Sequence, residues 1–270
     1  MSRRTREHII GDRGEARTQL AFIDSGFACN EVEKDYGEDF FVVTHGSDGT
    51  VEPFRIFVQS KATEPSADAK ARWTEYIDPL TARNWILGNE MVVVIKQDLT
   101  SRIARYCIPE EIYAYEDVHD YLFEAESARN FPIVCDQKFT RKTPSALVWR
   151  ARVRHYDRLI RLALPTDEFR GMPAADVYAM ELAFRLGLID TPFQPSVASL
   201  DLLRRLSPID GIEPEADMPE EDQQRYVACV RVTNDRMAQL APTCPIATRT
   251  LDLVAVALTR AYRSWQIEGR

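Results

Sequence analysis

Alternating hydrophobic and polar positions predict β-strands in the first half of the chain. Residues 39–44 and 54–61 are rich in β-branched and aromatic side chains and contain no glycine or proline, so each segment predicts a strand. Asp48 and Gly49 lie between these segments and form a turn signal, which predicts that the two strands pair as an antiparallel hairpin. Residues 91–95 are apolar at every position, as expected for a strand that is buried on both faces.

Further signals after the hairpin predict a short helix and another strand. Asp78 is a favourable N-cap followed by a proline, and Gly88 is a suitable stop, so residues 79–87 predict a helix. Residues 105–108 predict a strand that ends at Pro109, before a short helical stretch. This order of elements predicts an α/β (or α+β) architecture, in which a central mixed sheet is flanked by helices.

A helical pattern also precedes the hairpin. Apolar residues recur there at helical spacing, at Ala16, Leu20, Ile23 and Phe27. Asp12 and Glu15 match the spacing of a capping box, which places the start of the helix at these residues. Glu15 therefore has two interpretations: it satisfies backbone donors at the helix start, or it contributes a carboxylate to a functional site. The two roles are compatible.

The second half of the chain lacks strand-like alternation, and helical patterns replace it. The predicted helices are residues 176–188, 197–206, 219–240 and 246–267. The last two predict a helical hairpin, whose apolar stripes either pack within the chain or form a dimer interface. We therefore predict a first domain at residues 1–160 and an all-helical C-terminal domain at residues 161–270, which serves in oligomerisation or in recognition of a target or partner.

Composition sets outer limits on the class of protein. The chain has 270 residues, of which 45% are hydrophobic and 28% charged, enough for two compact globular units. It has no apolar stretch of membrane-spanning length, and its arginine-rich start lacks the apolar run of a signal peptide, so we expect a cytoplasmic protein without membrane association. The cysteines are scattered and lack zinc-site spacing, so we expect reduced thiols at Cys29, Cys107, Cys135, Cys229 and Cys244.

The charge pattern bears on nucleic-acid binding. The formal net charge is −8, whereas nucleic-acid-binding proteins usually present a basic surface. Basic residues concentrate at residues 138–158. Residues 145–155 predict a strand that carries Arg150, Arg152 and Arg154 on one face, which is our candidate for contact with a phosphate backbone. The alternative is a solvated edge strand that is protected by its charges.

Polar side chains gather where the predicted hairpin opens. Gln59 and Lys61 lie two residues apart on one strand, so they share a face, with their Cα atoms about 7 Å apart. Asp39 begins the other strand, at the same end of the hairpin. We expect these three side chains to meet there, with Glu15 or Asp35 supplying a second carboxylate.

Such a cluster predicts a metal site. Carboxylate and amide oxygens are hard ligands that suit Mg²⁺ or Mn²⁺, so Asp39 and Gln59 are candidate ligands, together with the backbone carbonyl of Ser60. The metal lowers the pKa of a bound water and offsets charge on a phosphate, while Lys61 is suited to orient that water or to stabilise the developing negative charge. This combination is what metal-assisted phosphodiester hydrolysis requires.

Three short segments in this order resemble a known family. They are G-D-R-G-E at residues 11–15, D-Y-G-E-D at residues 35–39 and V-Q-S-K at residues 58–61. Together they resemble the core of the PD-(D/E)xK nuclease superfamily, in the glutamine-containing version of Mrr-type restriction endonucleases and of prokaryotic proteins with G-x-x-G-E, D-x-G-x-D and Q-x-K motifs. The resemblance implies a restriction-endonuclease-like fold and Mg²⁺-dependent cleavage of DNA. The site residues that it implies are Glu15, Asp39, Gln59 and Lys61.

The expected activity is therefore that of a magnesium-dependent endodeoxyribonuclease. The resemblance also implies a role in prokaryotic defence against foreign DNA, and a homodimer is expected because cutting both strands usually needs two sites. The main alternative is a nuclease-fold module without efficient cleavage that acts as a nucleic-acid-binding or interaction subunit. A third hypothesis is an enzyme that becomes active only with a partner protein or a signal molecule. Motifs for zinc proteases, nucleotide-binding loops, Rossmann sites and serine hydrolases are absent from the sequence.

Overall fold

A computed structural model describes residues 5–32, 37–46, 49–63, 73–123, 130–163, 168–169 and 172–185. The chain divides into two compact units, residues 1–151 and residues 152–270, and each is described by itself. The division falls within the long helix α5 (Thr143–Ala163). The predicted boundary between residues 160 and 161 lies nearer the end of the same helix.

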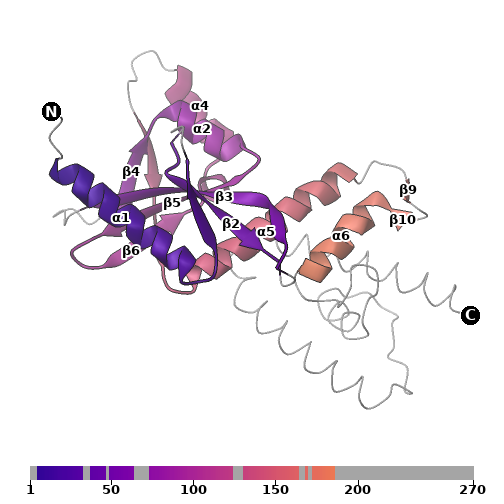
Figure 1. The fold of residues 1–270 in the computed structure, drawn as a ribbon. Helices are drawn as coiled ribbons and strands as arrows, with labels where there is room; N and C mark the ends of the chain where they lie inside the picture. The colour runs from indigo at the N-terminus through magenta and orange to yellow at the C-terminus, as the bar shows by residue number, and fades with distance from the viewer. Residues whose placement is uncertain are drawn as a thin grey trace, which may run out of the picture. The chain divides into compact units, whose positions relative to one another are not determined.

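The described part of the first unit is built on a mixed six-stranded sheet with the strand order β1-β2-β3-β5-β6-β8 (Figure 1). Its strands are β1 (Ala28–Glu31), β2 (Phe40–His45), β3 (Val51–Thr63), β5 (Met91–Asp98), β6 (Ile103–Cys107) and β8 (Gln137–Phe139). Strands β3 and β5 run parallel, and the other neighbouring pairs are antiparallel. A separate two-stranded sheet pairs β4 (Thr74–Ile77) with β7 (Phe131–Val134).

Helices cover both faces of this sheet, as the sequence predicts. Helix α1 (Arg6–Ile23) lies against β3, while α2 (Pro79–Leu87) packs beside α3 (Pro109–Ile112) and α4 (Tyr115–Phe123) (Figure 1). Among the described residues, each face of the sheet carries an apolar core. One joins Phe22 of α1 to the sheet, and the other joins Trp85 of α2 to the opposite face. Every residue of β5 is buried because it contributes side chains to both sides, which confirms the prediction from its apolar run.

The local signals for α2 and for the hairpin give correct elements. The Asp78 carboxylate accepts hydrogen bonds from the backbone N–H groups of Leu80 and Thr81, at 3.0 and 3.1 Å, and the helix ends before Gly88. Strands β2 and β3 pair as the predicted antiparallel hairpin, and β3 extends further in both directions than residues 54–61. The predicted strand before Pro109 and the short helix after it are also present.

The predicted start of the first helix is wrong. Helix α1 begins at Arg6, where Thr5 and His8 form the capping box, so Glu15 lies in the helix interior and does not cap it. Of the apolar residues that recur at helical spacing, Leu20 and Ile23 are 54% and 52% exposed, so they do not form the face toward the sheet. The face toward the sheet is formed instead by Gly14, Thr18 and Phe22. Small residues there let the helix approach the sheet more closely than larger apolar side chains would permit.

The predicted strand at residues 145–155 is also wrong, because this segment lies within α5. Helical geometry turns by about 100° per residue, so Arg150, Arg152 and Arg154 do not share one face. Arg150 is 3% exposed and forms an ion pair with Glu111 at 3.0 Å, and Arg154 is buried. The face on which the nucleic-acid-binding prediction depended therefore does not exist, and the edge-strand alternative fails with it.

The apolar residues of α5 explain this error. Leu147, Ala151 and Val153 alternate with polar residues as they would in a strand, but the buried set also includes Val148. Buried residues continue through Tyr156 and Ile160 at helical spacing. A window of eleven residues fits both periods, and the burial over the full length of the helix decides between them.

In the second unit the described residues add three elements: β9 (Glu168–Phe169), β10 (Met172–Pro173) and α6 (Ala174–Arg185). Helix α6 confirms the described part of the predicted helix at residues 176–188. The predicted helices at residues 197–206, 219–240 and 246–267, with their hairpin and dimer interface, lie outside the described residues. None of the helices within the described ranges is both long and apolar enough to span a membrane.

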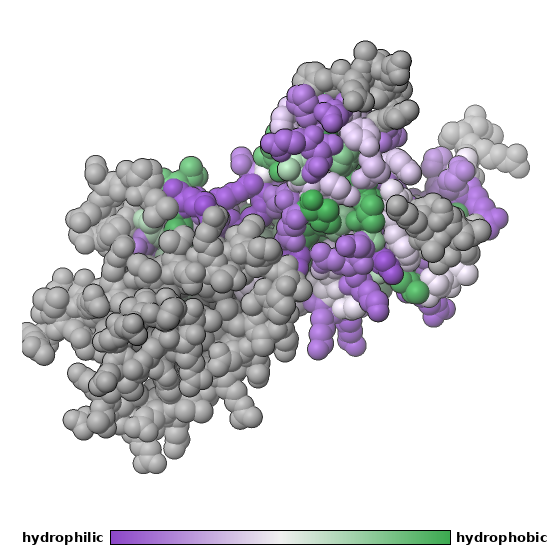
Figure 2. Space-filling model, turned by 180° about the vertical axis from the view of Figure 1, so that it is seen from behind, coloured by the Kyte–Doolittle hydropathy of each residue, from purple (hydrophilic) through white to green (hydrophobic). Residues whose placement is uncertain are grey.

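On the face shown in Figure 2, the described residues are mostly hydrophilic, and hydrophobic residues form small groups among them.

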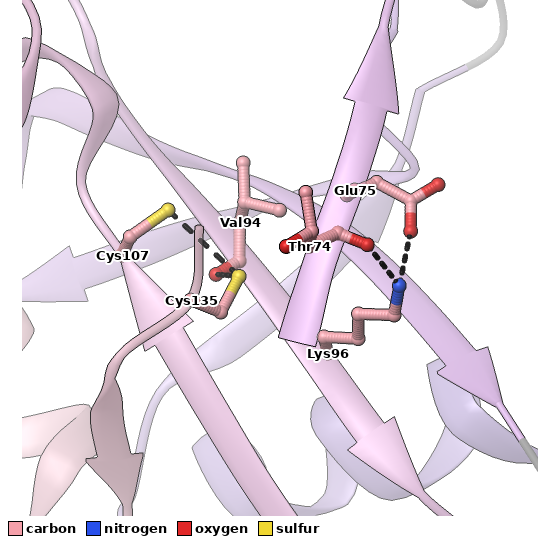
Figure 3. A network of polar contacts seen from close by, with 6 residues as sticks. All are labelled: Thr74, Glu75, Val94, Lys96, Cys107 and Cys135. Carbon is pink, nitrogen blue, oxygen red and sulfur yellow. Dashed lines mark hydrogen bonds and ion pairs between the residues drawn. The ribbon is translucent and has the colours of Figure 1, made fainter. Parts of the chain in front are cut away.

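Cys29, Cys107 and Cys135 are free thiols, as expected, while Cys229 and Cys244 lie outside the described residues. The sulfur atoms of Cys107 and Cys135 are 3.8 Å apart in the core beside β5 (Figure 3).

Candidate active site

The predicted site residues Asp39 and Gln59 lie together at the open end of the hairpin. Asp39 directly precedes β2, and its Oδ2 accepts a hydrogen bond from Gln59 Nε2 at 2.8 Å and another from the backbone N–H of Ser60 at 2.6 Å. The backbone N–H of Asp39 donates to the carbonyl oxygen of Val58 at 2.9 Å. Side chain and backbone together therefore fix the carboxylate of Asp39 against the end of β3.

The residues just before Asp39 are anchored on helix α2. Gly37 has a φ of +107°, and a Cβ atom at this position would lie 2.5 Å from Cγ2 of Thr81. Only glycine fits both the conformation and this close approach. Glu38 Oε1 accepts a hydrogen bond from the indole N–H of Trp85 at 2.7 Å. The glycine of the D-x-G-x-D segment thus has a structural role in positioning Asp39, while Asp35 lies outside the described residues.

Lys61 occupies the same face of β3 as Gln59. It is partly buried and forms no hydrogen bond or ion pair with the residues that the structure describes. Its cross-strand neighbour on β5 is Lys96, whose ammonium donates to the carbonyl oxygen of Thr74 and pairs with Glu75 at 2.9 Å (Figure 3). The charge of Lys96 is therefore engaged by β4, whereas Lys61 forms no such contact within the described ranges.

Glu15 approaches this cluster from helix α1. Its Oε1 accepts a hydrogen bond from Gln19 Nε2 at 3.0 Å. Burial raises the pKa of the Glu15 carboxyl above its ordinary value of 4.5, and the negative charge of Asp39 raises it further. The negative charges of Glu15 and Asp39 thus disfavour each other, and a bound cation would relieve that repulsion.

The donor set of this site contains few charged oxygen ligands. Within the described ranges, His, Cys, Asp and Glu side chains do not form a group of three or more that could hold a metal ion. A cation at this site would therefore depend on the carboxylates of Asp39 and Glu15, completed by neutral oxygens such as the Gln59 amide and the Ser60 carbonyl. Mg²⁺ commonly binds through one or two carboxylates and keeps several waters, so this limited set is compatible with it.

The raised pKa of Glu15 leads to a test in the metal-free protein. The folded protein holds this proton more tightly than the unfolded chain, so the ionised carboxylate lowers stability above the folded-state pKa and has no effect below the unfolded-state pKa. Glu15→Gln is therefore expected to raise the urea midpoint near pH 7 but not below about pH 4. The gain should stay under about 1 kcal/mol because solvent screens the partly exposed group. An equal gain at both pH values would contradict this expectation.

Two residues beside the site were missed by the sequence analysis. Thr18 of α1 and Gln97 of β5 are buried and form hydrogen bonds behind β3. The available signal was the spacing of Gly14 and Thr18, which are four residues apart and therefore place two small residues on one face of a helix.

No protein-family model, curated protein or solved structure was found to match the chain.

Proposed function

We propose that this protein is a Mg²⁺- or Mn²⁺-dependent nuclease that hydrolyses phosphodiester bonds in DNA, with a core that resembles the PD-(D/E)xK superfamily. The observation that carries the proposal is the cluster at the end of β3, where Asp39 is hydrogen-bonded to Gln59 and Ser60. Lys61 lies on the same face of β3 as Gln59 and forms no hydrogen bond or ion pair with the described residues. Glu15 adds a second carboxylate, whose charge interacts with that of Asp39.

The side chains of this cluster have separate roles in the proposed reaction. When bound, the divalent ion supplies a water of lowered pKa and neutralises charge on the phosphate. Asp39 and Glu15 provide the negative charge that attracts the ion, and Gln59 and the Ser60 carbonyl provide neutral oxygen atoms. The ammonium of Lys61 donates hydrogen bonds to the attacking water or to a phosphate oxygen, which stabilises the charge that develops in the transition state.

The fold is compatible with this proposal. Antiparallel pairing in a mixed sheet brings the start of β2 beside the end of β3, which is where a polynucleotide would bind in this proposal. We further propose that the C-terminal region provides oligomerisation or target recognition, and that dimerisation allows both strands to be cut. A function in defence against foreign DNA rests on the family resemblance alone.

The net charge of −8 favours one alternative, a nuclease-fold module that assists a complex without cleaving nucleic acid. Phosphate contacts supply much of the affinity for nucleic acids, and Arg150 is engaged by Glu111. An acidic protein in which the predicted face of Arg150, Arg152 and Arg154 does not form would then need a partner to bind DNA.

Cleavage assays on the full chain separate the two functions. Supercoiled plasmid, linear duplex, single-stranded DNA and RNA are incubated with Mg²⁺ or with EDTA, using the wild type, Lys61→Ala and a matched control, Lys138→Ala, at an exposed lysine of β8. We expect Mg²⁺-dependent cleavage of DNA that is lost in Lys61→Ala and kept in Lys138→Ala. Equal cleavage by the wild type and Lys61→Ala, or no cleavage of any substrate, would overturn the proposal.

A further inference from the structure

A buried polar cluster lies behind the candidate site, between helix α1 and the sheet. The helix approaches β3 so closely that a Cβ atom on Gly14 would lie 2.5 Å from Cβ of Ala62. Ala62 is paired across the strands with Gln97 of β5. The contact therefore places the backbone of α1 directly over the residues that follow Lys61 in β3.

Hydrogen bonds fix the helix at this point. Gln97 Nε2 donates to the carbonyl oxygen of Gly14 at 2.9 Å and also to the hydroxyl of Thr18. The Thr18 hydroxyl donates to the carbonyl oxygen of Gly14 at 3.0 Å and lies 2.9 Å from Oγ of Ser60. All of these side chains are buried, with Thr18 fully excluded from solvent.

The cluster specifies one position of the helix. Apolar packing tolerates sliding along a sheet, whereas a displaced helix would leave the amide of Gln97 or the hydroxyl of Thr18 buried without a partner. Such an unpaired group costs more than its hydrogen bond contributes in the native state. A fully satisfied buried network thus favours a single arrangement of α1 on the sheet.

The buried cluster is connected to the proposed site at two points, through the backbone of Ser60 and through the peptide bond that joins Gly14 to Glu15. Ser60 contacts Thr18 through its hydroxyl, and its backbone N–H donates to Asp39 Oδ2 at 2.6 Å. Glu15 directly follows Gly14, whose carbonyl group is held by Gln97. The two carboxylates of the site are therefore tied to the two sides of one buried network.

We infer that Gln97 and Thr18 are positioning residues that hold Glu15 beside Asp39 by fixing helix α1 over β3. Neither residue touches the substrate in this scheme, and both act through the helix. The inference rests on the proposed function for its effect on cleavage. Its geometric part, the placement of α1, can be measured without any activity.

A double-mutant cycle tests whether Gln97 acts through Glu15. Cleavage rates and Mn²⁺ affinity are measured for Gln97→Met, Glu15→Gln and the combined variant, below their unfolding temperatures. We expect Gln97→Met to lower cleavage or Mn²⁺ affinity by about 10- to 100-fold in the wild-type background. In the Glu15→Gln background its effect should be less than about two-fold because the residue that it positions is absent. Equal losses in both backgrounds would overturn the inference.

Thr44 provides a matched control for the variants of Thr18. Thr44 is also fully buried, but its hydroxyl has no hydrogen-bond partner in the described part of the chain, so Thr44→Val makes the same change in size without removing a hydrogen bond seen there. We expect Thr18→Val to reduce cleavage, Thr18→Ser to restore it, and Thr44→Val to leave it unchanged. Loss of cleavage in Thr44→Val equal to that in Thr18→Val would contradict a specific positioning role.

A nuclear Overhauser contact reports the helix position directly. The α-protons of Gly14 should lie close to the methyl group of Ala62, because a Cβ on Gly14 would overlap it. We expect this contact to weaken in Thr18→Val and Gln97→Met and to persist in Thr44→Val. Its persistence in all variants would overturn the inference even if the enzyme is active. If the wild type neither cleaves nor binds Mn²⁺ while the contact changes as expected, the proposed function fails and the positioning of α1 stands.

Discussion

Asp39→Asn is expected to lower Mg²⁺-dependent DNA cleavage by more than about 100-fold, beyond the 10- to 100-fold loss typical of residues that only support a metal ligand. The substitution keeps the size of the side chain and an oxygen that accepts the Ser60 N–H. It removes the negative charge that, in the proposed mechanism, binds the cation at the end of β3. The Mg²⁺ concentration for half-maximal activity should rise as the rate falls.

The fold should survive this substitution. Loss of the charged acceptor weakens the hydrogen bonds from Gln59 and Ser60, which corresponds to about 1 kcal/mol in the free energy of unfolding. Circular dichroism and urea unfolding measure this directly. Asp120→Asn on α4 is the matched control, since that side chain is 75% exposed, and it should leave both cleavage and stability unchanged. Full activity in Asp39→Asn would remove Asp39 from the mechanism.

Trp85→Ala is expected to lower the free energy of unfolding by about 3–5 kcal/mol, the range for deleting a large buried aromatic side chain. Trp85 is 2% exposed in the core on the α2 face of the sheet. Its indole also donates to Glu38, and its ring limits the space beside Gly37. Removing the ring therefore leaves a cavity and releases the segment that precedes Asp39.

This variant should affect function as well as stability. Chemical unfolding measures the loss in free energy, and cleavage is compared at a temperature where the variant is still folded. Leu87→Ala, at the end of the same helix, is the control because Leu87 is 57% exposed, and it should change stability by no more than about 0.5 kcal/mol. A loss under about 1 kcal/mol in Trp85→Ala would show that α2 is not the anchor that its burial indicates.

Much of the core fold could be predicted because its signals are local. Asp78, the proline after it and Gly88 specify the two ends of α2 with little dependence on the rest of the chain. The pairing of β2 with β3 follows from two strand patterns that a short turn joins. The apolar run of β5 predicts burial on both faces, since a strand in the middle of such a sheet contributes side chains to both layers.

Other elements could not be predicted, for reasons of packing. Alternation in residues 145–155 fits a strand, yet α5 is helical because its full length buries a helical face. In α1, Leu20 is exposed, whereas Gly14 and Thr18 face the sheet. Sequence periodicity favours the larger apolar side chains and cannot detect a close backbone approach, which depends on where Ala62 lies.

The candidate site likewise has one part that the sequence predicts and another part that depends on tertiary structure. That Asp39 and Gln59 should meet follows from the amino-acid sequence, because side chains alternate along a strand and the arms of a hairpin lie side by side. The approach of Glu15, the engagement of Lys96 by Glu75 and the network through Gln97 are decided by tertiary structure. These contacts join residues far apart in the chain, and the free energy that selects them comes from satisfying polar groups that packing has removed from water.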